Sequence, residues 1–143
     1  MSAKIDKFCD NLRDRLNTAE SRLTTMKTNV QALPKKAEKG LRDDLDKAKR
    51  KLQSQKERAE QTRANLKAWA QQDLAQTKKD VSDWKAKRES HKLNARADRA
   101  ETYASDAVDE ALYAIDVAEE AILEAAVARA DADSAQVPVA AAR

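Results

Sequence analysis

A ladder of alanines in the C-terminal third constrains this chain more than any other feature. Counting four and three residues alternately from Leu93, every one of the next twelve positions is alanine: Ala97, Ala100, Ala104, Ala107, Ala111, Ala114, Ala118, Ala121, Ala125, Ala128, Ala132 and Ala135. This is a heptad repeat with a very small residue at both seam positions, so a neighbouring helix can approach closely. If this seam is buried, replacing Ala111 or Ala118 with leucine should overpack it and cost roughly 1–3 kcal/mol.

A second heptad seam, made of larger residues, begins near the N-terminus. It contains Ile5, Cys9, Leu12, Leu16, Ala19, Leu23, Met26, Val30 and Leu33. Pro34 then disfavours a helical conformation at the preceding residue and suits the first turn of a new helix. We therefore expect helices over 2–33 and, after a turn, over 36–89, with Gly40 either in that turn or tolerated inside the second helix.

Composition supports a wholly helical chain. There are one glycine and two prolines in 143 residues, and 37% of the residues are charged. Sheets and frequent turns need more helix breakers than this. The sequence predicts an all-α fold of two to three long helices in an antiparallel coiled-coil bundle, with the alanine-rich heptad seam in the C-terminal helix. We expect a single domain over 1–135 and a disordered tail over 136–143.

The long middle segment carries a weaker seam, and its junction with the alanine ladder is ambiguous. The seam shifts at Leu66, Ala70 and Leu74, where a four-four spacing is typical of a stutter that unwinds a supercoil. Leu93 lies nine residues beyond Trp84, on roughly the opposite helix face. We expect a turn near residues 88–93 and a third helix over 93–132, and one continuous helix of some 90 residues is the alternative.

Charge divides the chain into two parts. Residues 1–92 hold 24 Lys and Arg against 14 Asp and Glu, a net +10, whereas residues 93–143 hold 4 against 11, a net −7. The two parts should attract each other. Basic residues recur at heptad spacing beside the middle seam, where such positions select a partner by charge. The candidate partner-binding residues are this basic stripe and the two tryptophans: Arg42, Lys49, Lys56, Arg63, Trp69 and Trp84.

Residues able to perform chemistry are few. The sequence predicts no catalytic, cofactor-binding or metal site, because it has one histidine, no glycine-rich phosphate loop and no Glu-x-x-His motif. His91 is expected at the surface. Cys9 is expected to be a small buried hydrophobe, and a crosslink across a parallel dimer or a redox thiol is the alternative.

These features favour a non-catalytic scaffold or adaptor protein that binds itself or another helical protein. The alternative is a basic helical protein that binds nucleic acid or another polyanion through its N-terminal two-thirds, as the sequence pI of about 9.0 allows. An enzyme is the least favoured class. No apolar run approaches the roughly 20 residues that span a bilayer. A cytoplasmic location is the default expectation.

Overall fold

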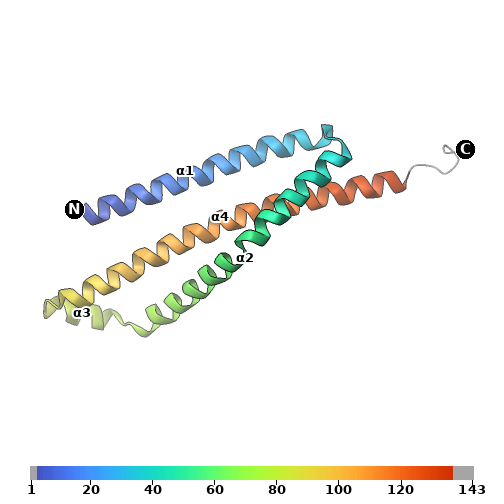
Figure 1. Ribbon diagram of the computed structural model, residues 1–143. Coiled ribbons are helices and arrows are strands. Elements are labelled where there is room, and N and C mark those ends of the chain that lie inside the picture. Colours follow the sequence, from blue (N-terminus) through green and yellow to red (C-terminus); the bar gives the residue numbers. More distant parts are fainter. Residues whose placement is uncertain (1–2, 137–143) are drawn as a thin grey trace, which may run out of the picture. The chain divides into compact units, whose positions relative to one another are not determined.

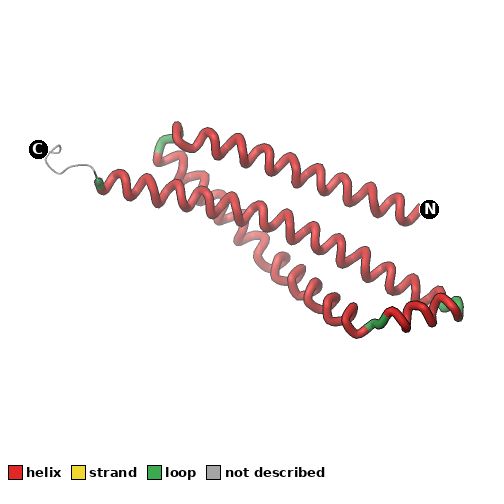
Figure 2. Tube along the Cα trace, turned by 180° about the vertical axis from the view of Figure 1, so that it is seen from behind, coloured by secondary structure: helices red, strands yellow, loops and turns green. Residues whose placement is uncertain are grey.

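The protein is described by a computed structural model over residues 3–136, and these residues are almost entirely helical (Figures 1 and 2). The elements are α1 (Ala3–Ala32), a 3₁₀ turn (Leu33–Lys35), α2 (Glu38–Ala75), α3 (Lys78–Ala86) and α4 (Ser90–Ala135). The all-α class is confirmed. The described part has four α-helices where two to three were predicted, because the expected helix over 36–89 is divided between α2 and α3.

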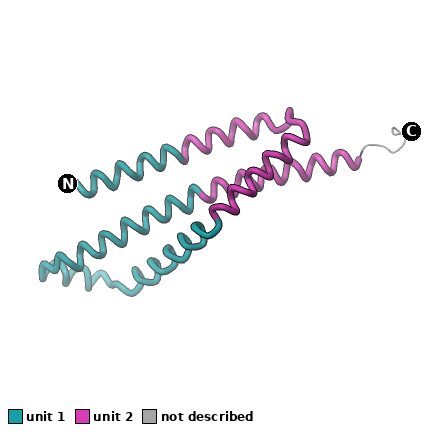
Figure 3. The backbone as a smooth tube through the Cα atoms, viewed as in Figure 1, with its two compact units in different colours: residues 1–18, 56–112 teal, residues 19–55, 113–143 magenta. Residues whose placement is uncertain are grey.

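The chain forms two compact units, coloured separately in Figure 3. Unit 1 comprises Met1–Thr18 and Lys56–Leu112, and unit 2 comprises Ala19–Gln55 and Tyr113–Arg143. Each unit therefore combines part of α1, part of α2 and part of α4. Within unit 2, the α2 and α4 segments run in opposite directions, since Arg42 pairs with Asp131 and Lys49 with Glu124.

The break between α2 and α3 has a local cause that is visible in the sequence. Thr77 is the N-cap of α3: its hydroxyl accepts a hydrogen bond from the Asp80 backbone N–H, and the Asp80 carboxylate accepts one from the Thr77 N–H, both at 3.2 Å. This reciprocal capping box satisfies two backbone donors at a helix start. The stutter predicted from the spacing of apolar residues is thus followed by a helix end and a new N-cap.

A turn separates α3 from α4, as expected from the change of phase near residues 88–93. Arg88 adopts a positive φ of 53°, and the Glu89 N–H donates to the Trp84 carbonyl at 2.9 Å. A non-glycine residue in this conformation is uncommon. No glycine or proline marks this turn in the sequence. Earlier in the chain, Pro34 lies in the 3₁₀ turn and Gly40 in the first turn of α2.

The seam of α2 supplies most of the buried side chains. The buried hydrophobic residues include Leu41, Leu45 and Ala48 in unit 2 and Ala59 in unit 1, and Thr62 is the next buried seam residue. In unit 2, Leu41, Leu45 and Ala48 pack with Leu123 and Val127 of α4 to form a core. Leu33 and Ala126 lie at the edge of this core. Leu123 and Val127, rather than the alanines of the ladder, are therefore the side chains that this segment of α4 contributes to the core.

The predicted burial of the alanine ladder is not confirmed. Eight of its twelve alanines are exposed and the other four are partly buried. Asp109, Asp116 and Leu123 recur every seven residues on the opposite side of α4, and each of them contacts α1 or α2 within its own unit. Alanine buries too little apolar area to compete with leucine or valine for the core face.

The exposure of the ladder predicts that enlarging one of its alanines has little effect on stability. Replacing Ala111 with leucine should change the free energy of unfolding by less than about 0.5 kcal/mol, as for an ordinary surface position. Urea denaturation of the variant beside the parent chain measures this. A loss in the 1–3 kcal/mol range of an overpacked core would show that the ladder is buried.

Two further expectations concern the chain as a whole. The disordered tail predicted over 136–143 lies, apart from Gln136, outside the described residues. Among the helices of residues 3–136, none combines the length and the apolar character needed to cross a membrane.

Candidate interaction surface

The basic stripe of α2 is largely engaged by carboxylates of α4. In unit 2, Arg42 pairs with Asp131 as well as with Glu38 of its own helix, and Lys49 pairs with Glu124 at 3.1 Å. In unit 1, the Arg63 guanidinium donates to Glu110 at 2.9 Å. The remaining member of the stripe, Lys56, is exposed. The stripe thus recognises the acidic helix of its own chain.

These contacts change the acid–base behaviour of two cations. The hydrogen bond to Glu124, followed by its charge, raises the pKa of Lys49. The hydrogen bond to Glu38, followed by the charge of Asp131, raises the pKa of Arg42. A raised pKa in the folded state means that the pair contributes fully below the unfolded pKa and is lost only as pH rises through the folded one. Since both groups are exposed, the contribution is screened by solvent.

The two tryptophans lie in unit 1 and are each partly buried. The Trp69 ring stacks on Tyr103 of α4, with centroids 3.9 Å apart and an interplanar angle of 14°. Trp84 of α3 has the Lys92 ammonium over its ring, 5.9 Å from the centroid. Both predicted binding residues therefore contact their own chain, and the aromatic stack ties α2 to α4 in this unit.

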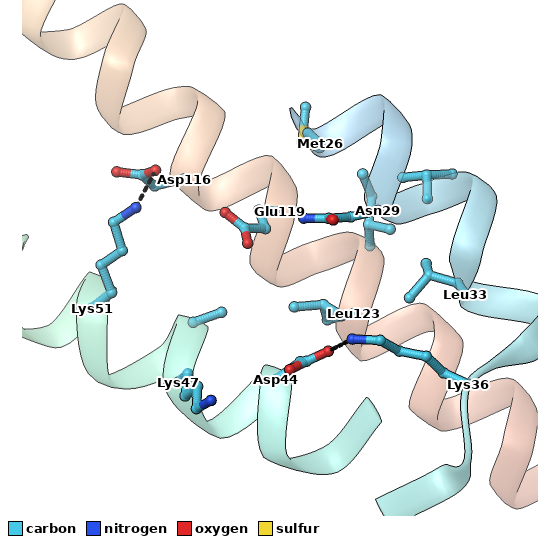
Figure 4. A pocket seen from close by; sticks show the side chains of 13 residues that line it. Met26, Asn29, Leu33, Lys36, Asp44, Lys47, Lys51, Asp116, Glu119 and Leu123 are labelled. Atoms are coloured by element: carbon cyan, nitrogen blue, oxygen red, sulfur yellow. Dashed lines mark hydrogen bonds and ion pairs between the residues drawn. The ribbon is translucent and has the colours of Figure 1, made fainter. Parts of the chain in front are cut away.

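A pocket of 250 Å³ opens between the three helical segments of unit 2 (Figure 4). Its most buried polar group is Asp116, which is 4% exposed. Lys51 donates to Asp116 at 3.0 Å, and Arg22 lies 3.5 Å from its other carboxylate oxygen. The lining has three lysines and three carboxylates, so it carries no net charge. The ion pairs of Asp116 join α1, α2 and α4. The lining as a whole favours neither anionic nor cationic ligands.

The surface that the sequence did not single out lies on α1. Its heptad seam consists of two rows. In one row Leu12, Ala19, Met26 and Leu33 are partly buried and Ile5 is exposed, whereas all four residues of the other row, Cys9, Leu16, Leu23 and Val30, are exposed. Val30 also lines the unit 2 pocket. The exposed fractions of Leu16, Leu23 and Val30 are 56%, 48% and 40%. We call these four residues the α1 apolar row. The expectation that Cys9 is buried is wrong, since its thiol is free and exposed.

In residues 3–136, no three or more His, Cys, Asp and Glu side chains are grouped so that they could hold a metal ion. His91 is exposed at the start of α4. The exposed apolar row of α1 is the candidate interaction surface.

Comparison with known proteins adds no relative. No family model matches the chain, no curated protein matches it significantly, and no solved structure does so.

Proposed function

We propose that this protein is a non-catalytic helical interaction protein that self-associates, with the α1 apolar row as its contact surface. The observation that carries the proposal is the exposure of Leu16, Leu23 and Val30 at heptad spacing on one helix. Heptad-spaced leucine and valine are the side chains with which helices pack against one another in coiled coils. Coiled-coil packing of the assembly and a cytoplasmic location stay predictions within the same proposal.

The pairing of the basic stripe favours this function over polyanion binding. Phosphates would have to displace Asp131, Glu124 and Glu110 from Arg42, Lys49 and Arg63. The self-association proposal needs no such exchange, because the α1 apolar row is already exposed. Binding of another helical protein to the same row is the alternative form of the proposal. A test of self-association distinguishes the two.

The test is the mass of the protein in solution. The parent chain should be a dimer or larger at micromolar concentration, and a variant with Leu16→Lys and Leu23→Lys should be a monomer, because two ammonium groups cannot be desolvated in an apolar contact. Light scattering after size exclusion measures both masses, and circular dichroism checks that helicity is retained.

Leu74 provides a matched control. It is 85% exposed near the end of α2 and lies outside the row, so Leu74→Lys should leave the mass unchanged. A parent chain that is monomeric across the concentration range would overturn the proposal of self-association. Equal masses for the double variant and the Leu74 variant would show that the contact surface is elsewhere.

A further inference from the structure

We propose that two copies of this chain associate through α1 in antiparallel orientation, so that a row of alternating charges beside the α1 apolar row becomes self-complementary. This inference rests on the proposed self-association and adds its geometry. The occupant of the exposed face is a second copy, and the argument comes from the order of charges along one continuous helix, Ala3–Ala32.

The charged row consists of Asp6, Arg13, Glu20 and Lys27. These residues recur every seven positions, all are exposed, and each lies three residues before a member of the apolar row. Residues three and four apart are neighbours on a helix surface. The apolar and charged rows therefore form one face, with the charges running negative, positive, negative, positive from the N-terminal end.

Reversing this order changes every sign. When two α1 helices lie antiparallel, Asp6 of one copy comes opposite Lys27 of the other, and Arg13 comes opposite Glu20. The two-fold symmetry repeats both pairs, so all four charges of each copy meet an opposite charge. In an in-register parallel pair each residue would meet its own copy, which places like charges together along the whole contact. Flanking charges of this kind set the orientation and partner of helices in coiled coils.

The rest of α1 leaves this face available to a partner. Leu12, Ala19, Met26 and Leu33 are partly buried, and Arg15 and Arg22 turn to Asp109 and Asp116 within their respective units. Of the charged row, Arg13 also pairs with Asp10 at 3.0 Å on its own helix, with both side chains exposed. An exposed pair of this kind is weak, so Arg13 can exchange it for Glu20 of another copy.

A parallel arrangement staggered by seven residues would also bring opposite charges together, but with a different outcome. It would match Asp6 with Arg13, Arg13 with Glu20 and Glu20 with Lys27, leaving one charge unmatched at each end. Such a contact uses different residues on the two copies, so it lacks two-fold symmetry and matches three charge pairs instead of four. The antiparallel contact is closed and gives a dimer.

The single cysteine makes the orientation measurable without further substitution. Cys9 is exposed and belongs to the apolar row. In the antiparallel pair it comes opposite Thr24, so the two Cys9 residues are separated by fifteen residues, or about 22 Å along the helix axis. In an in-register parallel pair they would be about 10 Å apart or less, the usual separation of packed helices. Double electron–electron resonance on the full chain, spin-labelled at Cys9, distinguishes the two.

A charge reversal tests the cause of the orientation. The variant with Arg13→Glu and Lys27→Glu makes the row wholly acidic, so that like charges face each other in the dimer. It should raise the dimer dissociation constant by about tenfold or more, because a tenfold change needs only a small difference in interaction energy. The variant with Asp6→Lys and Glu20→Lys makes it wholly basic and should do the same, and equimolar mixing should restore the dimer. Lys4→Glu with Lys7→Glu, on exposed positions of α1 outside both rows, is the control with equal charge change.

The outcomes separate this inference from the function on which it rests. A dimer with Cys9 labels more than about 20 Å apart supports the antiparallel pair. A dimer with close labels, or with ready Cys9 disulfide formation, would overturn the antiparallel geometry while leaving self-association intact. A label separation between those of the antiparallel and in-register parallel pairs would indicate the staggered contact and also overturn it. A monomer at all concentrations would overturn both.

Discussion

Replacing Arg22 and Lys51 together with methionine should lower the free energy of unfolding by about 3–5 kcal/mol. The two substitutions keep most of the side-chain volume but remove both cations that pair with Asp116, which is only 4% exposed. A buried carboxylate that has lost its partners bears a desolvation cost that the pair had offset. Urea unfolding followed by circular dichroism measures the loss.

The cause can be isolated by removing the carboxylate as well. Adding Asp116→Leu to the double variant should restore most of the lost stability, because an apolar group of similar size needs no counter-ion. Methionine at two exposed lysines, Lys7 and Lys56, is the control for a change of two charges. Equal stability of the double variant and this control would mean that Asp116 does not depend on Arg22 and Lys51.

Replacing Leu123 with alanine should destabilise the protein by about 2–5 kcal/mol, as for other large-to-small changes in a core. Leu123 belongs to the unit 2 core with Leu41, Leu45, Ala48 and Val127. This core has few members, so the space left by the deleted methyl groups has few neighbours that could fill it. Thermal unfolding of the variant measures the loss.

The same substitution at an exposed leucine provides the comparison. Leu74→Ala removes the same atoms from a side chain that is 85% exposed, and should cost less than about 0.5 kcal/mol. A similar cost at both positions would contradict the assignment of Leu123 to the core.

Several features of the fold can be predicted from particular residues of the sequence. The scarcity of glycine and proline predicts the all-α class, and Pro34 predicts the first turn. The opposite charges of the middle and C-terminal segments predict that basic residues such as Lys49 and Arg63 contact acidic residues such as Glu124 and Glu110. The seam containing Leu45, Ala48 and Ala59 predicts the buried face of α2. Each of these depends on local preference, charge or periodic apolar area.

The features that could not be predicted depend on comparing faces of the same helix. The alanine ladder is the most regular pattern in the chain, yet regularity does not measure the area that a face buries. Leu123 and Val127 outweigh it on the opposite side of α4. The residue type at position 88, arginine, does not predict a positive φ. The stacking of Trp69 on Tyr103 requires a particular register between two helices, and neither helix specifies that register alone. The capping box at Thr77 and Asp80 could have been found from its spacing.

The candidate site shows the same division. The basic stripe lies along one helix, α2, but only the structure shows that Arg42, Lys49 and Arg63 have carboxylates beside them. The exposed row of the α1 seam has the same sequence pattern as the partly buried row. The ion pairs of Arg15 with Asp109 and of Arg22 with Asp116 could not be read from that pattern.

The ion pairs between α2 and α4 also bear on the order in which the chain can acquire its structure during synthesis. Arg42, Lys49 and Arg63 are separated from Asp131, Glu124 and Glu110 by 89, 75 and 47 positions, and the acidic partner is always made later. Protein segments begin to fold from the N-terminal end while translation continues. The basic helices of a nascent chain therefore leave the ribosome before the helix that neutralises them exists, and their charge is compensated only when the last third of the chain has been made.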